Sequence, residues 1–299
     1  NGISCTINKG EVFAIVGESG CGKSTVAHSI MKLLPGNNAE VSGKIDFKGK
    51  NLLDFNEEEI EKIRGKEIGM IFQNPLDSLN PVYTVGAQVA EAIELDHVSR
   101  EDAWKKVIEL FKSVKMPDAE ERAHSFPHEL SGGMRQRVMI AMMISRNPDL
   151  LIADEPTTAL DVTIEAQILE IMRELKEKNN TAIMLITHNF GLVAEIADRI
   201  GIMYAGEMVE IGDVYEIFEN PKHPYTKLLM QALPRKTKAE SRLKTISGSV
   251  PRITEIKNEC RFSNRCPYAE EICHTQVPPV VQVADDHMCR CHLLRKEVK

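Results

Sequence analysis

One stretch near the start of the chain, residues 17–25, constrains the fold more than any other. It reads Gly-Glu-Ser-Gly-Cys-Gly-Lys-Ser-Thr and fits the phosphate-binding pattern G-x-x-x-x-G-K-[ST]. The apolar run Val12–Val16 before it is typical of a buried strand, and residues 26–34 after it predict a helix. In this context backbone N–H groups line an anion site at a helix N-terminus. The sequence therefore predicts a nucleoside triphosphate site rather than only a glycine-rich helix cap.

Within this stretch, individual side chains have separate expected tasks. Lys23 is expected to reach the β- and γ-phosphates, and the Ser24 hydroxyl is a candidate Mg²⁺ ligand. The residues expected to line the nucleotide are the whole loop: Gly17, Glu18, Ser19, Gly20, Cys21, Gly22, Lys23, Ser24 and Thr25.

Length and composition limit the classes of protein to consider. The 299 residues are enough for one large domain with an extension, or for two domains. The formal charge of −7 argues against a general nucleic-acid binder, because neutralising phosphates needs a basic face. Apolar runs such as Val138–Ile144 are much shorter than the roughly 20 residues that span a bilayer. The chain starts at Asn1, next to an expected strand at 3–7, and we interpret it as N-terminally truncated.

The rest of the pattern alternates strands with helices, which predicts an α/β core. Strands are expected at 41–49, 68–72, 150–153, 181–187, 200–204 and 208–212, of which the first alternates like an antiparallel strand. Helices are expected at 57–64, from Asp161 to about Lys178, at 214–219 and at 223–232. Three more, at 85–97, 100–114 and 132–146, predict a helical subdomain inserted between strands.

Polar side chains stand at the C-terminal ends of three expected strands, where α/β sheets place their chemistry. Gln73 and Asp154 are candidate Mg²⁺ ligands, and Glu155 is the candidate general base for a water that attacks the γ-phosphate. His188 is expected to contact the γ-phosphate or to hold the water and Glu155. Taken alone, Gln73 is more typical of an ordinary loop residue, and His188 is more typical of a structural histidine.

A second anion site is expected at the start of the 132–146 helix. Ser131 is a good N-cap, and Gly132 and Gly133 leave the positively polarised helix N-terminus uncovered by side chains. The alternative is that these residues form only a flexible entry to the helix.

Taken together, these motifs resemble the ABC-type ATPases over residues 1 to about 220. The resemblance rests on 17–24, Gln73, 130–136, 150–155, 159–161 and His188, which occur in that family's order. It implies a P-loop NTPase of the α/β class, with a RecA-like core, an antiparallel β subdomain and an inserted helical subdomain at about 83–146. The implied ATPase domain covers 1–232. Gln136 and Asp161 join Ser131, Gly132 and Gly133 as implied nucleotide contacts.

Other stretches are similar to the dipeptide/oligopeptide importer branch of this family: 72–81, 155–163, 223–226, 248–251 and 260–267. The branch implies an ATP-hydrolysing subunit, peripheral on the cytoplasmic face of the membrane, that energises peptide import. Implied partners are a paralogous ATPase or a second copy in a head-to-tail nucleotide sandwich, two transmembrane permease subunits docked near Gln73, and an extracytoplasmic peptide-binding protein. Nickel importers are close relatives, and a soluble ABC ATPase is the competing class. The family's adenine-stacking aromatic lies upstream of residue 1, so no residue is assigned to it.

Cysteines crowd the C-terminal extension, 233–299, at Cys260, Cys266, Cys273, Cys289 and Cys291. Thiolates suit iron–sulfur clusters or Zn²⁺, but the first three lack the close C-x₂₋₄-C spacing of structural zinc sites. In the peptide-importer branch a cysteine-rich segment holds a 4Fe–4S cluster. That resemblance implies the ligands Cys260, Cys266, Cys273 and Cys291, with Cys289 as the alternative to Cys291. Zn²⁺, no metal, or a disulfide are the alternatives that stay open.

Overall fold

The computed structural model describes residues 2–34, 40–73, 78–158, 160–233, 246–251, 256 and 258–296. The chain forms two compact units. The terminal unit comprises Asn1–Thr6, Phe13–Lys23 and Thr187–Lys299, and the central unit comprises Ile7–Val12 and Ser24–Ile186. The loop at 74–77, which belongs to the importer-like stretch 72–81, lies outside the described residues.

The central unit is built on three parallel strands in the order β4 (Ile68–Ile71), β5 (Leu150–Asp154) and β6 (Ala182–Thr187). Met70 pairs with Ile152, which pairs with Met184. These strands are buried almost throughout, which explains why they appear in the sequence as continuous apolar runs. The helices α1 (Lys23–Ile30), α2 (Glu57–Ile63) and α7 (Val162–Asn179), and the antiparallel pair β2 (Asp46–Phe47) and β3 (Lys50–Asn51), complete its α/β part.

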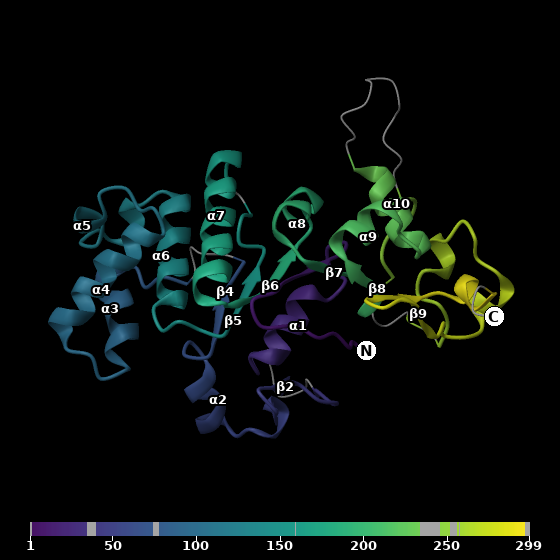
Figure 1. Cartoon of the computed structure of the whole chain (residues 1–299), viewed down its shortest axis with the longest axis horizontal. Helices are drawn as coiled ribbons and strands as arrows, with labels where there is room; N and C mark the ends of the chain where they lie inside the picture. The colour runs from purple at the N-terminus through teal and green to yellow at the C-terminus, as the bar shows by residue number, and fades with distance from the viewer. Residues whose placement is uncertain are drawn as a thin grey trace. The chain divides into compact units, whose positions relative to one another are not determined.

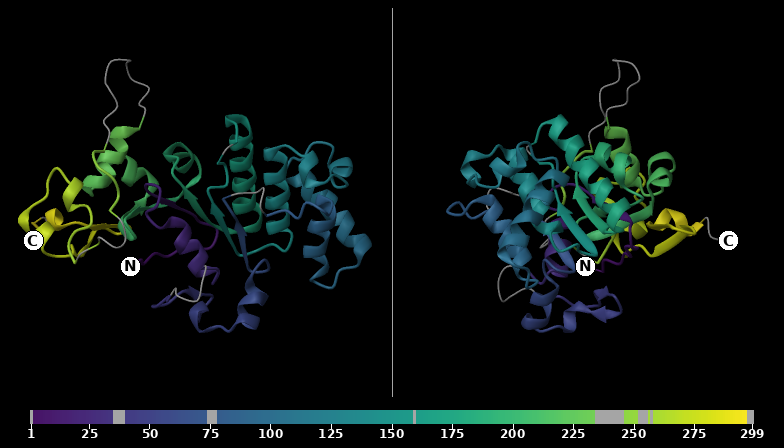
Figure 2. Two further views of the ribbon diagram at one scale, coloured as in Figure 1. Left: turned by 180° about the vertical axis from the view of Figure 1, so that it is seen from behind. Right: turned by 60° about the vertical axis from the view of Figure 1, so that its left-hand side comes forward.

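The inserted helical part of the central unit contains α3 (Val85–Glu94), α4 (Arg100–Ser113), α5 (Ala119–Arg122) and α6 (Gly132–Ile144). These helices cluster together in Figures 1 and 2. Side-chain oxygens of Thr84, Ser99 and Ser131 cap the starts of α3, α4 and α6. Phe111 and Val138 are fully buried where α4 and α6 pack against each other.

The terminal unit holds strands in the order β1 (Val12–Val16), β7 (Arg199–Tyr204), β8 (Glu207–Asp213), β10 (His287–Arg290) and β9 (Val280–Ala284). β1 and β7 are parallel, and the remaining pairs are antiparallel. Its helices are α8 (Phe190–Ile196), α9 (Val214–Glu219) and α10 (Pro224–Ala232). In Figure 1 the yellow C-terminal strands lie directly beside β8.

Several expected elements differ from the structure. The helix after the phosphate loop begins earlier, at Lys23, and ends at Ile30, shortly before Lys32 adopts a left-handed φ of 51°. The strand expected at 41–49 shrinks to Asp46–Phe47, because Gly43 and Gly49 have positive φ angles of 108° and 81°. Residues 3–7 form no strand, whereas β9 and β10 were not expected at all. Within the described residues no helix is long and apolar enough to span a membrane.

Candidate functional site

The phosphate loop in the terminal unit accepts only glycine at its first position. A Cβ on Gly17 would lie 2.2 Å from the carbonyl oxygen of Met203 and 2.8 Å from the sulfur of Cys21. Gly20 and Gly22 have φ angles of 78° and 101°, which side-chain-bearing residues rarely adopt. The loop therefore needs these glycines to pass close to β7 and to turn its backbone inward.

Lys23 lies inside the curve of this loop. Its Nζ donates hydrogen bonds to the carbonyl oxygens of Gly17, at 2.8 Å, and Glu18, at 3.2 Å. Its side chain is buried, so the ammonium is held at the loop rather than in solvent. Burial also raises the pKa of the Cys21 thiol, which favours its protonated form. Cys21 is therefore better described as a small residue that the loop tolerates than as a reactive thiol.

Within the central unit, Glu155 is hydrogen-bonded to two neighbouring residues of the candidate site. Its Oε2 accepts hydrogen bonds from Gln73 Nε2 at 3.0 Å and from Thr158 Oγ1 at 2.9 Å. Its φ of 48° lies in the left-handed region, which costs a residue with a side chain about 1 kcal/mol or more. Such strain is typical of functional positions, and here it follows the end of β5 directly.

Asp154, which ends β5, and His188, which follows β6, lie in different environments. Asp154 is the last residue of β5 and is 2% exposed, whereas His188 follows β6 and is exposed. Carboxylate oxygens are ligands that Mg²⁺ prefers, so Asp154 at the end of β5 has the chemistry of a Mg²⁺ ligand. Ser24, which is also an expected Mg²⁺ ligand, lies in the first turn of α1.

The second expected anion site lies at the start of α6. Ser131 caps the helix, since its Oγ accepts a hydrogen bond from Met134 N at 3.3 Å. A Cβ on Gly133 would meet Ile164 Cγ2 at 2.9 Å, but a Cβ on Gly132 would have its nearest neighbour, Leu160, at 3.9 Å. Gly133 is therefore needed for packing against α7, and Gly132 leaves the helix end open.

Two residues expected to contact the nucleotide, Gln136 and Asp161, are buried in a helix or cap one in the structure. Gln136 is 2% exposed, and its Nε2 has no hydrogen-bond partner among the described residues. Asp161 caps α7, because its Oδ1 accepts a hydrogen bond from Ile164 N at 2.9 Å. Their contact with nucleotide stays a prediction.

Four C-terminal cysteines influence one another electrostatically. Burial raises the pKa of Cys260 to about 12, and Cys273, Cys291 and Cys266 add to the rise. Burial also raises the pKa values of Cys266 and Cys291, and Cys273 contributes to both. Burial, Glu210 and Cys291 raise the pKa of Cys289 as well. The electrostatics therefore do not separate Cys289 from the four implied ligands.

These thiols are nevertheless not gathered as ligands. In the described part of the chain, no three or more His, Cys, Asp or Glu side chains lie together as a metal would require. None of the seven cysteines, all of which are described, forms a disulfide. Cys289 and Cys291 both belong to an apolar cluster with Leu294 and, at its edge, Val281.

The sequence alone did not reveal a network around Glu18. Tyr225 OH accepts a hydrogen bond from Glu18 N at 3.2 Å. Arg265 Nη1 donates to both carboxylate oxygens of Glu18, at 3.1 and 3.2 Å. The available signals were the importer-like stretches 223–226 and 260–267, which contain these two residues without indicating what they contact.

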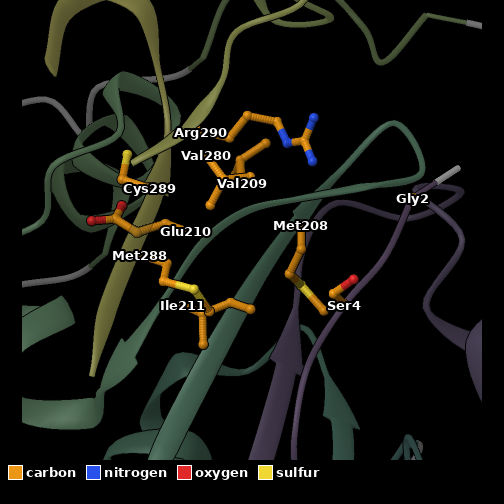
Figure 3. Close-up of a pocket in the computed structure, with 10 residues that line it drawn as sticks. All are labelled: Gly2, Ser4, Met208, Val209, Glu210, Ile211, Val280, Met288, Cys289 and Arg290. Carbon is orange, nitrogen blue, oxygen red and sulfur yellow. The ribbon is translucent and has the colours of Figure 1, made fainter. Parts of the chain in front are cut away.

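A second network, missed as well, surrounds Glu210 on β8. Its carboxylate accepts hydrogen bonds from Lys222 N at 2.6 Å and His223 N at 3.0 Å, and lies 2.8 Å from His287 Nε2. Figure 3 shows Glu210 close to Cys289 in a pocket between β8 and β10. This pocket of about 100 Å³ is too small for a nucleotide, since ligand sites are typically about 300–1,000 Å³.

Known protein families match both the part of the chain that contains the phosphate loop and a part that includes much of the C-terminal extension. The family model "ABC transporter" matches residues 1–158, and "Oligopeptide/dipeptide transporter, C-terminal region" matches residues 209–273. The oligopeptide transport ATP-binding protein OppD of Bacillus subtilis is 48% identical over 299 residues, covering 99% of this chain and 84% of that protein. The dipeptide transport ATP-binding protein DppD of Escherichia coli is 46% identical over 291 residues, covering 97% and 89%.

Solved structures give the same result for the fold. A dimeric ATP-binding cassette in a post-hydrolysis state, bound to ADP and Pi, matches with a TM-score of 0.64 and 28% identity. The match covers 71% of this chain and 89% of that one. A part of the ABC transporter complex cbiONQ from Clostridium perfringens matches with a TM-score of 0.64 and 29% identity, covering 73% and 83%.

Proposed function

The chain belongs to the ABC transporter ATP-binding family, and from this membership we propose that it is the ATP-hydrolysing subunit that energises import of dipeptides or oligopeptides. As a member it is an ABC-type ATPase that uses ATP and Mg²⁺. The expected P-loop NTPase fold is confirmed by the two cassette structures. Peptides are proposed as cargo because the relatives are named for peptide transport and the extension matches their C-terminal region.

The observation that carries the proposal is the position of Lys23 against the carbonyl groups of Gly17 and Glu18. A lysine held there, in a loop whose first glycine tolerates no Cβ, fits the phosphates of ATP. Ser24, Gln73 and Asp154 are the proposed Mg²⁺ ligands, and bound Mg²⁺ neutralises charge on the β- and γ-phosphates.

Glu155 is proposed as the general base. Gln73 and Thr158 donate hydrogen bonds to its Oε2 and so orient the carboxylate that would accept the proton of an attacking water. His188 is proposed to contact the γ-phosphate, and its position directly after β6 supports this role.

The complete unit is proposed to be a head-to-tail pair in which the start of α6 approaches a partner's ATP. Ser131 and Gly132 are exposed, and the cap satisfies only one of the backbone N–H groups at this end. The matching cassette bound to ADP and Pi is itself dimeric. A paralogous ATPase or a second copy is the proposed partner, with two transmembrane permease subunits and an extracytoplasmic peptide-binding protein at the membrane.

Two variants test the ATPase assignment. Lys23→Ala should abolish binding of Mg-ATP, whereas Glu155→Gln should bind Mg-ATP normally but hydrolyse it at least a hundredfold more slowly. The matched controls Lys50→Ala and Glu58→Gln change exposed residues of the same types and should behave as the unaltered chain. Hydrolysis by Glu155→Gln at the normal rate would remove Glu155 as the base.

Transport tests the cargo. The chain, its partner ATPase and the permease subunits would be reconstituted in vesicles with dipeptides, longer peptides or Ni²⁺. ATP-dependent uptake of peptides is expected. Uptake of Ni²⁺ alone would favour the nickel importers, and a chain that joins no membrane subunits would favour a soluble ABC ATPase.

For the extension, we propose a 4Fe–4S cluster on Cys260, Cys266, Cys273 and Cys291. Support comes from their ligand chemistry and from their crowding within one short extension. Their sulfur atoms would have to move together for ligation, because the described residues contain no grouped ligand set. Absorption spectra and iron and zinc analysis of anaerobically purified protein test this: iron-free protein contradicts the cluster, and stoichiometric zinc favours Zn²⁺.

A further inference from the structure

Arg265 links the cysteine-rich extension to the phosphate loop, although 247 residues separate it from Glu18 in the sequence. Its Nη1 lies 3.1 and 3.2 Å from the two carboxylate oxygens of Glu18 and 3.2 Å from Tyr204 OH. Its Nε donates to Ser247 O at 2.9 Å. The Arg265 side chain is only 6% exposed and that of Glu18 is 29% exposed, so the ion pair is partly shielded from solvent.

Glu18 in turn connects this ion pair to Lys23. The carbonyl oxygen of Glu18 accepts from Lys23 Nζ, its N–H donates to Tyr225 OH, and its carboxylate accepts from Arg265. Each polar group of this residue therefore has a fixed partner. A change in the Glu18 side chain would alter the carbonyl on which Lys23 rests.

A second arginine, Arg261, is linked to the phosphate loop through the turn at residues 205–207. Arg261 donates to the carbonyl of Ala205 and pairs with Glu207 at 3.2 Å. Between these two residues Gly206 N donates to Cys21 O at 2.8 Å. Arg261 and Arg265 lie between Cys260 and Cys266, so one short segment of the extension supports the loop at two points.

Attachment of this segment does not depend on Arg265. Phe262 is 2% exposed, and its ring lies 5.1 Å from that of Tyr204 and 5.3 Å from that of Tyr225. Burial of this ring beside two tyrosines stabilises the attachment of the segment independently of the ion pair. The contact with Glu18 is therefore separable from docking of the extension.

We propose that Arg265 is a positioning residue for ATP binding: by holding Glu18, it keeps Lys23 and the N–H groups of the loop in the geometry that receives the phosphates. This role rests on the proposed ATP site at residues 17–25. It assigns the extension a task in nucleotide binding, in which the segment between Cys260 and Cys266 supports the phosphate loop.

The test uses Arg265→Met in the full-length chain, which keeps the aliphatic stem and removes the charge. The Kd for Mg-ATP, measured by titration calorimetry, should rise about tenfold, equal to about 1.4 kcal/mol. Arg265→Lys should recover most of this loss. Arg295→Met is the matched control, because Arg295 pairs with Glu270 in the same extension at an exposed position, and its Kd should not change.

Two further measurements separate positioning from folding. In a Glu18→Gln background, Arg265→Met should cause no additional rise in Kd, since it acts through Glu18. Amide hydrogen exchange of Arg265→Met should increase in the loop at 17–23 but remain unchanged in β10. An unchanged Kd, an additive double variant, or lost protection in β10 would each overturn the role of Arg265.

The outcomes also distinguish this role from the proposed site. If Lys23→Ala binds Mg-ATP as tightly as the unaltered chain, the site itself fails. If Lys23→Ala loses Mg-ATP but Arg265→Met keeps it, only the role of Arg265 fails.

Discussion

The buried His223 should make the terminal unit sensitive to mild acid. Burial lowers its pKa from an ordinary 6.5 to about 4, so the folded protein keeps this imidazole neutral where an unfolded chain would protonate it. Its Nδ1 accepts a hydrogen bond from Tyr225 N, which caps α10 and requires the neutral ring. Because the folded-state pKa is depressed, the stabilisation is complete above pH 6.5 and is lost as the pH falls toward 4.

The size of the effect follows from the separation of the two pKa values. A difference of about 2.5 pH units corresponds to about 3 kcal/mol in total, of which about 2 kcal/mol is lost at pH 5. For a chain of this length that loss lowers Tm by about 4 °C. No correction for solvent screening is needed, because the side chain is 2% exposed.

Thermal unfolding at pH 7.5 and pH 5 measures this contribution. His223→Asn retains a capping side chain but has no titrating ring, so its Tm should fall about 4 °C less between the two pH values than that of the unaltered chain. His97→Asn, at an exposed position, should follow the unaltered chain. Equal pH responses of His223→Asn and the unaltered chain would refute the link between burial and acid sensitivity.

Three more predictions concern the loop, the start of α6 and the cysteines. Tyr225→Phe should raise the Kd for Mg-ATP two- to threefold in titration calorimetry, because it removes the acceptor of the Glu18 N–H but keeps the ring packing. Gly133→Ala should lower Tm in a thermal melt by several degrees through its 2.9 Å clash, whereas Gly132→Ala should keep Tm and reduce ATP hydrolysis in the assembled pair. Cys291→Ser should lower the iron content of anaerobically purified protein, and Cys289→Ser should not; the opposite result would exchange the two as ligands.

The sequence predicts the parts of this fold that depend on local pattern. Buried parallel strands appear as apolar runs, so β6 was expected at 181–187 and lies at Ala182–Thr187. Ser131 was expected as an N-cap from residue type alone, and the structure confirms it. Gln73 and Glu155 come together because the ends of neighbouring parallel strands meet at one edge.

Long-range pairing is the part that local pattern cannot supply. β9 alternates between exposed and half-buried residues and lies beside β10, which pairs with β8 at a distance of some 77 residues along the chain. Gln73 and Glu155 are 82 positions apart in the sequence, and a predictable sheet brings them together. Glu18 and Arg265 are 247 positions apart, and no predictable element brings them together. Nothing in a Cys-rich segment indicates that its arginine reaches a phosphate loop.

Cys266 and Cys289 lie beside different parts of the terminal unit. Cys266 follows Arg265 directly, and Arg265 pairs with Glu18 in the phosphate loop, so Cys266 lies one residue away from this contact. Cys289 lies opposite Glu210 in the β8–β10 pair, and Glu210 joins the start of α10 to His287 of the extension. Removing that carboxylate would leave several buried donors unsatisfied at about 1–3 kcal/mol each. Chemistry at Cys266 should therefore alter ATP affinity, whereas chemistry at Cys289 should alter the stability of the unit.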